Sequence, residues 1–308
     1  MADYYAFSGI DDAIEKTKSL LWPFNWSIWW RIAVISLFTG GFGGINFPFS
    51  PSSYSQPFDS TQAFTGMPGL LPGIILLLIA ALLLIAVVFA FLSSIFQFVF
   101  VRCLSENEFM LKKYFVENIG RGLRLFAFWI VLFLAAGVSA LALFMFALAA
   151  GGAFSALLII PAIGIFLLIL LLVAIIALFT SDFVVPIMIK DECGVIEGWK
   201  KCWGVLRASL SQSLVYLVMR IVISIVVAII LVIISVLVLI AIGIPFLAVF
   251  ILSGAVFGLS PLNITLLILF LVIAIPVLLV ICVPFNTFLR VYSLKVLGKM
   301  EERYNLIE

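Results

Sequence analysis

The chain contains no histidine, and only 10% of its 308 residues carry a charge. Catalysis by Ser-His-Asp or Cys-His arrangements needs an imidazole, so both classes are excluded. The four cysteines do not form a C-x-x-C pair, and without histidine they predict no metal site. No nucleophile–base pair or metal-ligand set is present. We therefore expect a protein that is not an enzyme and that needs no cofactor.

Apolar residues take the place of charge. They make up 66% of the chain, against roughly 45–50% in soluble domains. Runs of about 20 apolar residues predict membrane spans. We expect six, at Ile28–Gly44, Leu71–Val101, Gly122–Ala149, Phe154–Ile189, Leu210–Ile242 and Leu262–Tyr292. Phe246–Leu259 is too short to span and follows Pro245, so it predicts a re-entrant or outer-surface segment.

The basic residues indicate the orientation. Every one of the 17 lysines and arginines falls at, or nearest to, the same end of an apolar segment, and the opposite side receives only Asp59. Basic loops stay in the cytoplasm, so the protein is predicted to lie in a plasma membrane with both termini on the cytoplasmic side. A seventh span at Phe246–Leu259 would move Arg290 and Lys295 outside, against this rule. Anionic lipid headgroups suffice to explain the basic side, so no nucleic-acid partner is expected.

Three amphipathic segments precede the outward spans, at Ile10–Leu21, Phe109–Leu123 and Val195–Leu206. Their periodicity is typical of helices that lie in the headgroup layer. In the third, the predicted apolar stripe is Ile196, Trp199, Cys202 or Trp203, and Leu206, with Lys200, Lys201 and Arg207 reaching headgroups. The predicted interfacial anchors are Trp22, Trp29, Trp30, Arg31, Trp199 and Trp203.

These elements repeat. Each unit has an interfacial helix, an outward span and an inward span, over residues 8–104, 105–191 and 192–297, with an extracytoplasmic loop at 45–70. The sequence predicts one membrane domain over residues 1–308. Its fold class is an all-α integral membrane protein with six transmembrane helices as three hairpins, each preceded by a cytoplasmic amphipathic interfacial helix.

Two ionisable residues, Asp182 and Arg220, lie inside consecutive antiparallel apolar runs. A charge at the membrane centre costs roughly 2.5–3.5 kcal/mol, so we expect the two to pair. Gln97 and Asn286, at equivalent repeat positions, are the expected further members. The cluster is interpreted as a structural tie, a polar groove for lipid headgroups or a small solute, or a proton relay. A simple pair predicts that Arg220→Met destabilises more than replacement of both residues.

Two stretches resemble known families. The N-terminal part of the chain resembles the start of an uncharacterised archaeal multi-pass membrane family. The resemblance rests on Ala13-Ile14, Leu20-Leu21-Trp22-Pro23-Phe24, Trp30-Arg31-Ile32-Ala33 and the Gly40–Gly44 cluster. A later stretch resembles the membrane domain of some glycerophosphodiester phosphodiesterases. This resemblance rests on Val185-Pro186-Ile187, Gly194–Trp199, Trp203 and Leu206-Arg207. The resemblance implies six spans in an archaeal or bacterial plasma membrane. It does not imply phosphodiester hydrolysis, because that activity belongs to a separate metal-binding soluble barrel.

Three functions remain open. The first is a module that binds, organises or translocates membrane lipid without catalysis. The second is a scaffold or subunit that docks an unidentified membrane protein through the loop at 45–70. The third is a secondary transporter, disfavoured by the scarcity of titratable groups in the spans and the lack of broken inverted repeats.

Overall fold

The computed structural model describes residues 5–40, 70–149, 154–252 and 261–307. Every regular element in these ranges is a helix, which confirms the all-α prediction. Helices satisfy the backbone hydrogen bonds of long apolar runs without a neighbouring strand. The major elements are α1 (Tyr5–Leu21), α2 (Trp26–Gly40), α4 (Leu70–Glu106), α5 (Leu111–Ala149), α6 (Phe154–Phe179), α7 (Val185–Lys190), α8 (Val195–Ala208), α9 (Leu210–Leu252) and α10 (Pro261–Met300). A π-helical turn, η1 (Thr180–Val184), joins α6 to α7, and a short 3-10 turn, η2 (Glu302–Tyr304), follows α10.

Five helical rods are long and apolar enough to cross a membrane, by length and composition: residues 76–106, 111–143, 161–190, 210–251 and 261–300. They support a multi-pass membrane protein. The helix that begins the predicted first span, α2, has 15 described residues. At 1.5 Å per residue it is about 22 Å long, less than the roughly 30 Å of a hydrocarbon core. The remainder of that predicted span, and the loop at 45–70, lie largely outside the described residues.

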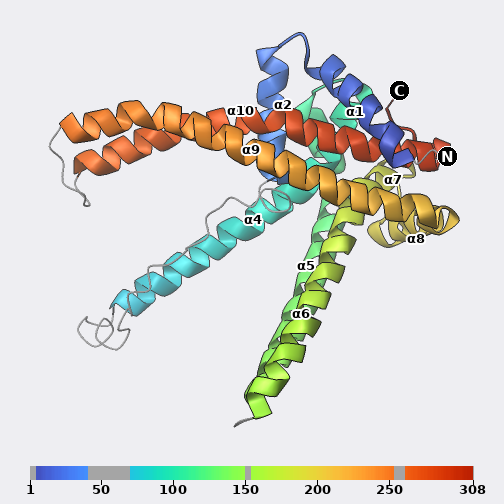
Figure 1. Ribbon diagram of the computed structural model, residues 1–308, viewed down its shortest axis with the longest axis horizontal. Coiled ribbons are helices and arrows are strands. Elements are labelled where there is room, and N and C mark those ends of the chain that lie inside the picture. The colour runs from blue at the N-terminus through green and yellow to red at the C-terminus, as the bar shows by residue number, and fades with distance from the viewer. Residues whose placement is uncertain (1–4, 41–69, 150–153, 253–260, 308) are drawn as a thin grey trace.

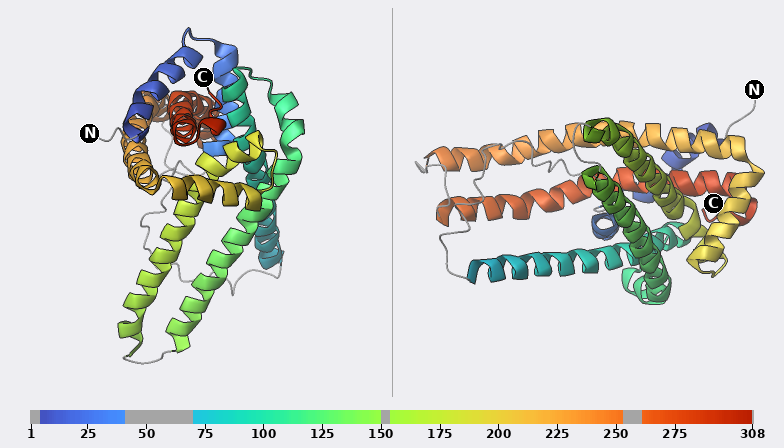
Figure 2. Two further views of the ribbon diagram at one scale, coloured as in Figure 1. Left: turned by 90° about the vertical axis from the view of Figure 1, so that its right-hand side faces the viewer. Right: turned by 90° about the horizontal axis from the view of Figure 1, so that it is seen from below.

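The helices meet at one end of the molecule and diverge from it (Figures 1 and 2). We call the meeting end the base; it contains α1, α2, η1, α7, α8, η2 and the adjoining ends of α4, α5, α9 and α10. The arms are the helical segments beyond it, at residues 70–93, 126–149, 154–178, 221–252 and 261–282. The α5/α6 arms leave the base in a different direction from those of α4, α9 and α10, and α2 crosses α10.

Almost all of the core lies in the base. Among the arm residues whose burial is described, only Val227 and Ala274 are buried. In the base, stacked aromatic rings link η1, α9 and α10: the ring centroid of Tyr216 lies 4.7 Å from that of Phe183 and 5.8 Å from that of Tyr292. The arms therefore expose apolar surface, and the base holds the protein together.

The helix α1 was predicted to lie in the headgroup layer, and its periodicity is confirmed, but it packs directly against α10. A stripe of small residues is buried at that contact: Ala6, Gly9, Ala13 and Thr17. A Cβ added at Gly9 would lie 2.9 Å from Val296 Cγ2, so the two helices approach closely. Of the residues at helical spacing in Ile10–Leu21, Ala13, Thr17 and Leu21 are buried as an amphipathic helix predicts, whereas Ile14 is 53% exposed.

The prediction of a separate second interfacial helix at Phe109–Leu123 is wrong. The helix α5 runs without a break from Leu111 to Ala149. Nothing in this stretch ends a helix: it contains no proline, and Gly122 is held in helical conformation by packing against Ile95 of α4. The first turns of α5 and its apolar span are one rod.

The prediction that a span ends near Ile242 is also wrong, because α9 continues through Pro245 to Leu252. Proline removes one helical hydrogen bond. Contacts with α10 support the helix here, since the ring centroids of Phe246 and Phe270 lie 5.6 Å apart. The predicted re-entrant segment is therefore part of α9 as far as Leu252, and its remainder lies outside the described residues.

The contact of Gly122 with α4 gives a matched test. A Cβ at Gly122 would lie 2.4 Å from Ile95 Cγ1 and 3.0 Å from its Cα, whereas one at Gly120 would meet nothing within 4 Å. We expect Gly122→Ala to lower the free energy of unfolding in detergent by about 1–3 kcal/mol through overpacking. Gly120→Ala should be neutral or stabilise by about 0.5–1 kcal/mol, the usual gain in a helix. Equal effects of both substitutions would contradict this packing.

Candidate functional site

The carboxylate of Asp182 lies at the centre of the base, on the π-helical turn η1. Pro186 has no N–H to donate to the Asp182 carbonyl four residues earlier, so the α-helical pattern cannot continue through this turn. The wider turn places the Asp182 side chain toward α9 and α10, where it is only 3% exposed. A carboxylate buried this deeply needs charged or hydrogen-bonding partners.

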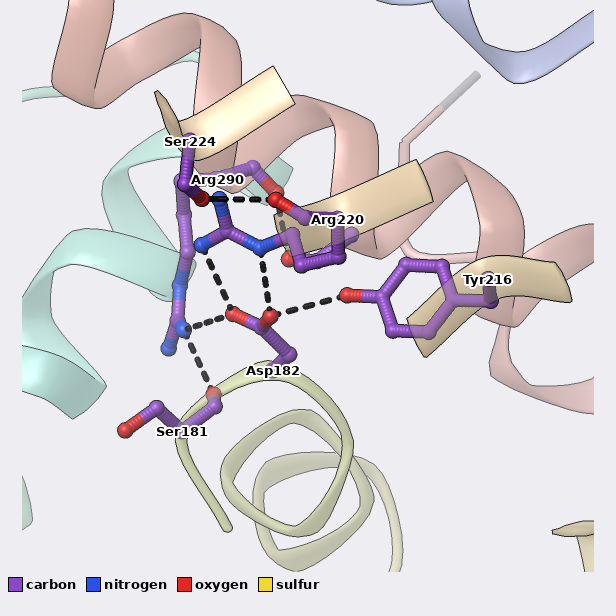
Figure 3. A network of polar contacts seen from close by, with 7 residues as sticks. Ser181, Asp182, Tyr216, Arg220, Ser224 and Arg290 are labelled. Atoms are coloured by element: carbon purple, nitrogen blue, oxygen red, sulfur yellow. Dashed lines mark hydrogen bonds and ion pairs between the residues drawn. The ribbon is translucent and has the colours of Figure 1, made fainter. Parts of the chain in front are cut away.

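Its partners come from two helices (Figure 3). Oδ2 of Asp182 accepts hydrogen bonds from the Tyr216 hydroxyl and from Arg220 Nε, both at 2.8 Å. Oδ1 lies 3.4 Å from Arg220 Nη2 and 3.7 Å from Arg290 Nη1. The carboxylate therefore joins η1 to α9 and α10 at once. We call these four residues, with Ser224, the Asp182 network.

Each arginine has a further attachment. Arg220 Nη1 donates to Ser224 Oγ at 3.1 Å, and that hydroxyl donates to the Arg220 carbonyl at 2.7 Å. Arg290 donates to the backbone carbonyls of Ser181 and Gln97. Through Gln97 the network reaches α4, so four segments of the base are tied to one carboxylate.

The predicted contact between Asp182 and Arg220 is confirmed. The predicted extension through two amides is not found: Gln97 contributes its backbone carbonyl, and Gln97 Oε1 and Asn286 Nδ2 have no hydrogen-bond partner in the described part of the chain. Sequence reasoning missed Tyr216 and Arg290. Tyr216, Arg220 and Ser224 recur every four residues on α9, which is the signal that places them on one face.

Two guanidinium groups face a single carboxylate in this network. Within the described ranges, no second carboxylate forms an ion pair with either arginine, and no group of three His, Cys, Asp or Glu residues could hold a metal ion. The carboxylate is occupied by its partners on both oxygens. This arrangement is suited to fixing the register of helices, and it offers no free base or nucleophile.

The predicted anchors have mixed surroundings. Trp22, Trp30 and Trp203 are 70%, 44% and 58% exposed. Trp29 is partly buried and donates from Nε1 to the Leu21 carbonyl at 3.2 Å. Arg31 donates to the Phe109 carbonyl at 2.9 Å, which ties α2 to the loop before α5. Trp199 is half-buried against the core. Their role as membrane anchors stays a prediction.

The predicted apolar stripe of α8 is confirmed at Cys202 and Leu206 but is wrong at Ile196. The buried face contains Val195, Gly198, Cys202, Val205 and Leu206, with Gly198 close against η1 and α7. Ile196, predicted inward, is 75% exposed beside Trp203, and Lys200 and Arg207 are exposed on the same side. Small side chains permit the close contact, so the larger residues face outward. Burial raises the pKa of the Cys202 thiol to about 12, which keeps it protonated and unreactive.

A second buried carboxylate, Asp191, lies in the loop between α7 and α8. Lys201 Nζ is 2.9 Å from Oδ2, Arg303 Nη2 is 2.7 Å from Oδ1, and the Tyr304 hydroxyl donates to Oδ2 at 3.0 Å. Burial by itself raises the pKa of Asp191, but the hydrogen bonds from Lys201 and Tyr304 and the charges of Lys201 and Arg303 outweigh it. The net effect is a pKa below the ordinary value. This cluster attaches the C-terminal residues to the base.

Comparison with known proteins places the chain in a family. A model described as "Family of unknown function (DUF7544)" matches residues 4–307. The chain belongs to this family. No curated protein and no solved structure matches it significantly. The resemblance to the membrane domain of glycerophosphodiester phosphodiesterases therefore has no support from these comparisons.

The second arginine changes the mutational expectation for the Asp182 network. Arg220→Met leaves Asp182 with Arg290 and Tyr216, so it should cost about 1–3 kcal/mol. Asp182→Asn leaves two buried guanidinium groups without a carboxylate and should cost about 3–5 kcal/mol. The double variant leaves Arg290 unpaired, so it should be less stable than Arg220→Met, the reverse of what a simple pair predicts. SDS titration of the protein in mixed micelles measures all three; if Arg220→Met proves the least stable, Arg290 does not share the carboxylate.

The Asp191 cluster predicts a pH effect. Because its pKa is lowered by folding, its contribution to stability is complete above the ordinary carboxyl pKa of about 4 and is lost as the pH falls through the folded value. Asp191→Asn imitates the protonated state at neutral pH. Hydrogen exchange of residues 302–307 should become faster in this variant, whereas Glu197→Gln, which alters the exposed second partner of Lys201, should leave it unchanged. Unchanged protection in Asp191→Asn would mean that other contacts hold the C-terminus.

Proposed function

We propose that this chain is a plasma-membrane protein with six spans in three hairpins that binds and organises lipid, without catalysis, at its cytoplasmic base. The placement rests on charge. All 17 lysines and arginines lie outside the arms. Beyond the Asp182 network, each arm has more than the roughly 20 residues needed to cross a bilayer, and most of them are apolar. The network then lies near the cytoplasmic edge, where its burial costs less than at the membrane centre.

The proposed number of spans is inferred from the side of the molecule on which the two described ends lie. Both described ends, Tyr5 and Ile307, lie at the base, and Leu70 begins α4 at the far end of its arm (Figure 1). Five crossings would leave the two ends on opposite sides. The sixth crossing of the proposal is therefore the span predicted at Ile28–Gly44. The arms carry few buried side chains, so a bilayer is free to align them.

One observation carries the lipid function: the outward face of α8 combines apolar and basic side chains. Ile196 and Trp203 are exposed on it, flanked by Lys200 and Arg207. An exposed tryptophan between cations is the composition of a helix that lies in the headgroup layer. The opposite face of α8 is buried in the core, so the base holds this surface in a fixed orientation.

The alternative functions have less support. A transporter needs a substrate site, and both carboxylate oxygens of Asp182 are occupied by partners from within the protein. A scaffold is the stronger alternative, since the arms expose large apolar surfaces that a second membrane protein can cover.

Gentle extraction followed by native mass spectrometry tests the proposal. We expect retained phospholipid enriched in anionic species. Each cation near a membrane surface contributes about 1 kcal/mol, so the loss of two in Lys200→Glu/Arg207→Glu should lower that enrichment by about 30-fold or more. The charge-conserving pair Lys200→Arg/Arg207→Lys is the control and should match the wild type.

Two results would contradict the proposal. A co-eluting protein with no specific lipid would identify a scaffold subunit. A reporter fused after Glu308 that is active only outside the cytoplasm would place the base on the wrong side of the membrane.

A further inference from the structure

A groove of about 330 Å³ lies where α4 meets the first turns of α5. It is lined by Phe96, Leu111, Lys112, Phe115 and Val116. Four of these side chains are apolar, and the single cation is on the first turn of α5. An apolar groove with one cation at its edge matches the two parts of a phospholipid, an acyl chain and a phosphate.

The groove is built by rigid contacts. Phe96 stacks on Phe38 of α2, with ring centroids 4.6 Å apart, and its ring lies 5.7 Å from that of Phe115. On another side of α5, Tyr114 is buried and donates to Glu106 at 2.6 Å. This anchor fixes the rotation of α5. Lys112, Phe115 and Val116, three and four residues apart, consequently share the groove-lining face.

Lys112 is the charged group available to a ligand. It is exposed, and within the described ranges no carboxylate forms an ion pair with it. Two nearby carboxylates have other partners: Glu117 pairs with Arg102, and Glu106 accepts from Tyr114. The third, Glu108, is exposed in the loop before α5. Lys113 differs, because its ammonium lies 5.7 Å from the centre of the Tyr114 ring. The α5 helix also begins here, and its positive N-terminal dipole favours an anion.

The continuation of the groove favours a lipid over a soluble anion. Val116, Ile119 and Leu123 follow one another along α5 toward its arm and are 68%, 39% and 55% exposed. This apolar track leads from Lys112 into the surface that faces lipid in the proposed orientation. An acyl chain can follow it without crossing a polar region, whereas a water-soluble ligand would leave it uncovered.

We infer that this groove, which we call the Lys112 groove, is a binding site for one anionic phospholipid, with its phosphate at Lys112 and an acyl chain against Phe96 and Phe115. The inference rests on the proposed function, specifies its ligand class, and adds a defined site apart from the outward face of α8. A second groove, of about 190 Å³ between α2 and α10, is lined by Trp26, Trp30, Pro276, Val277, Val280 and Ile281. It has no charged lining residue, so it serves as an internal comparison without headgroup selectivity.

The test uses the full chain in nanodiscs of equimolar phosphatidylglycerol and phosphatidylcholine, released for native mass spectrometry. The wild type should retain one phosphatidylglycerol in preference to phosphatidylcholine. Lys112→Gln should reduce this preference by about fivefold, the effect of one cation near a membrane surface. Val116→Trp should lower retention of both lipids by filling the groove. Lys113→Gln and Val280→Trp, which lie outside the groove, should retain phosphatidylglycerol as the wild type does.

The outcomes separate this site from the proposed function. If Lys112→Gln keeps the wild-type preference while Lys200→Glu/Arg207→Glu loses it, the Lys112 groove is wrong and the lipid function stands. If the wild type retains no phospholipid, both fail. Lys112→Gln alters an exposed side chain, so it is expected to fold even if Val116→Trp does not.

Discussion

The need to neutralise one buried carboxylate organises the base. Asp182 cannot be buried without partners, and those partners are on α9 and α10, with a further link through Arg290 to the backbone of α4. The aromatic stack of Phe183, Tyr216 and Tyr292 surrounds the same point. The positions of α8 and of the Lys112 groove depend on this arrangement, because both are built on segments that the network and its surrounding core hold.

The packing of the arms depends on other interactions than the packing of the base. In lipid, apolar side chains gain little from packing against one another, so the hydrophobic effect does not draw spans together. The protein concentrates its polar ties, its small-residue contacts and its core at one end, and its arms remain apolar on nearly every side. The contacts in the base therefore determine where each arm begins.

The sequence predicts those features that hydrophobicity and charge determine. Long apolar runs gave the helices, and two isolated charges in consecutive runs gave the contact of Asp182 with Arg220. The role of Arg290 was not predicted, because it lies near other basic residues and was counted with them as part of the cytoplasmic end of the last span. Single positions on the faces of α1 and α8, Ile14 and Ile196, were misassigned for a shape-based reason: Gly9 and Gly198 contribute little hydrophobicity but permit close approach. No residue pattern separates an interfacial helix from the start of a rod in α5, where the contact with Ile95 decides.

The packing of α1 on α10 also has a consequence for biosynthesis. Helix α1 is synthesised well before α10, its main partner, and the Tyr292 hydroxyl donates to the Ala6 carbonyl between them. Arg290, which completes the charge network, is also in α10. A nascent chain therefore carries α1 without its partner, and Asp182 without its full set of cations, until α10 has been synthesised. The contacts that join α1, η1 and α9 to α10 can form only after that point.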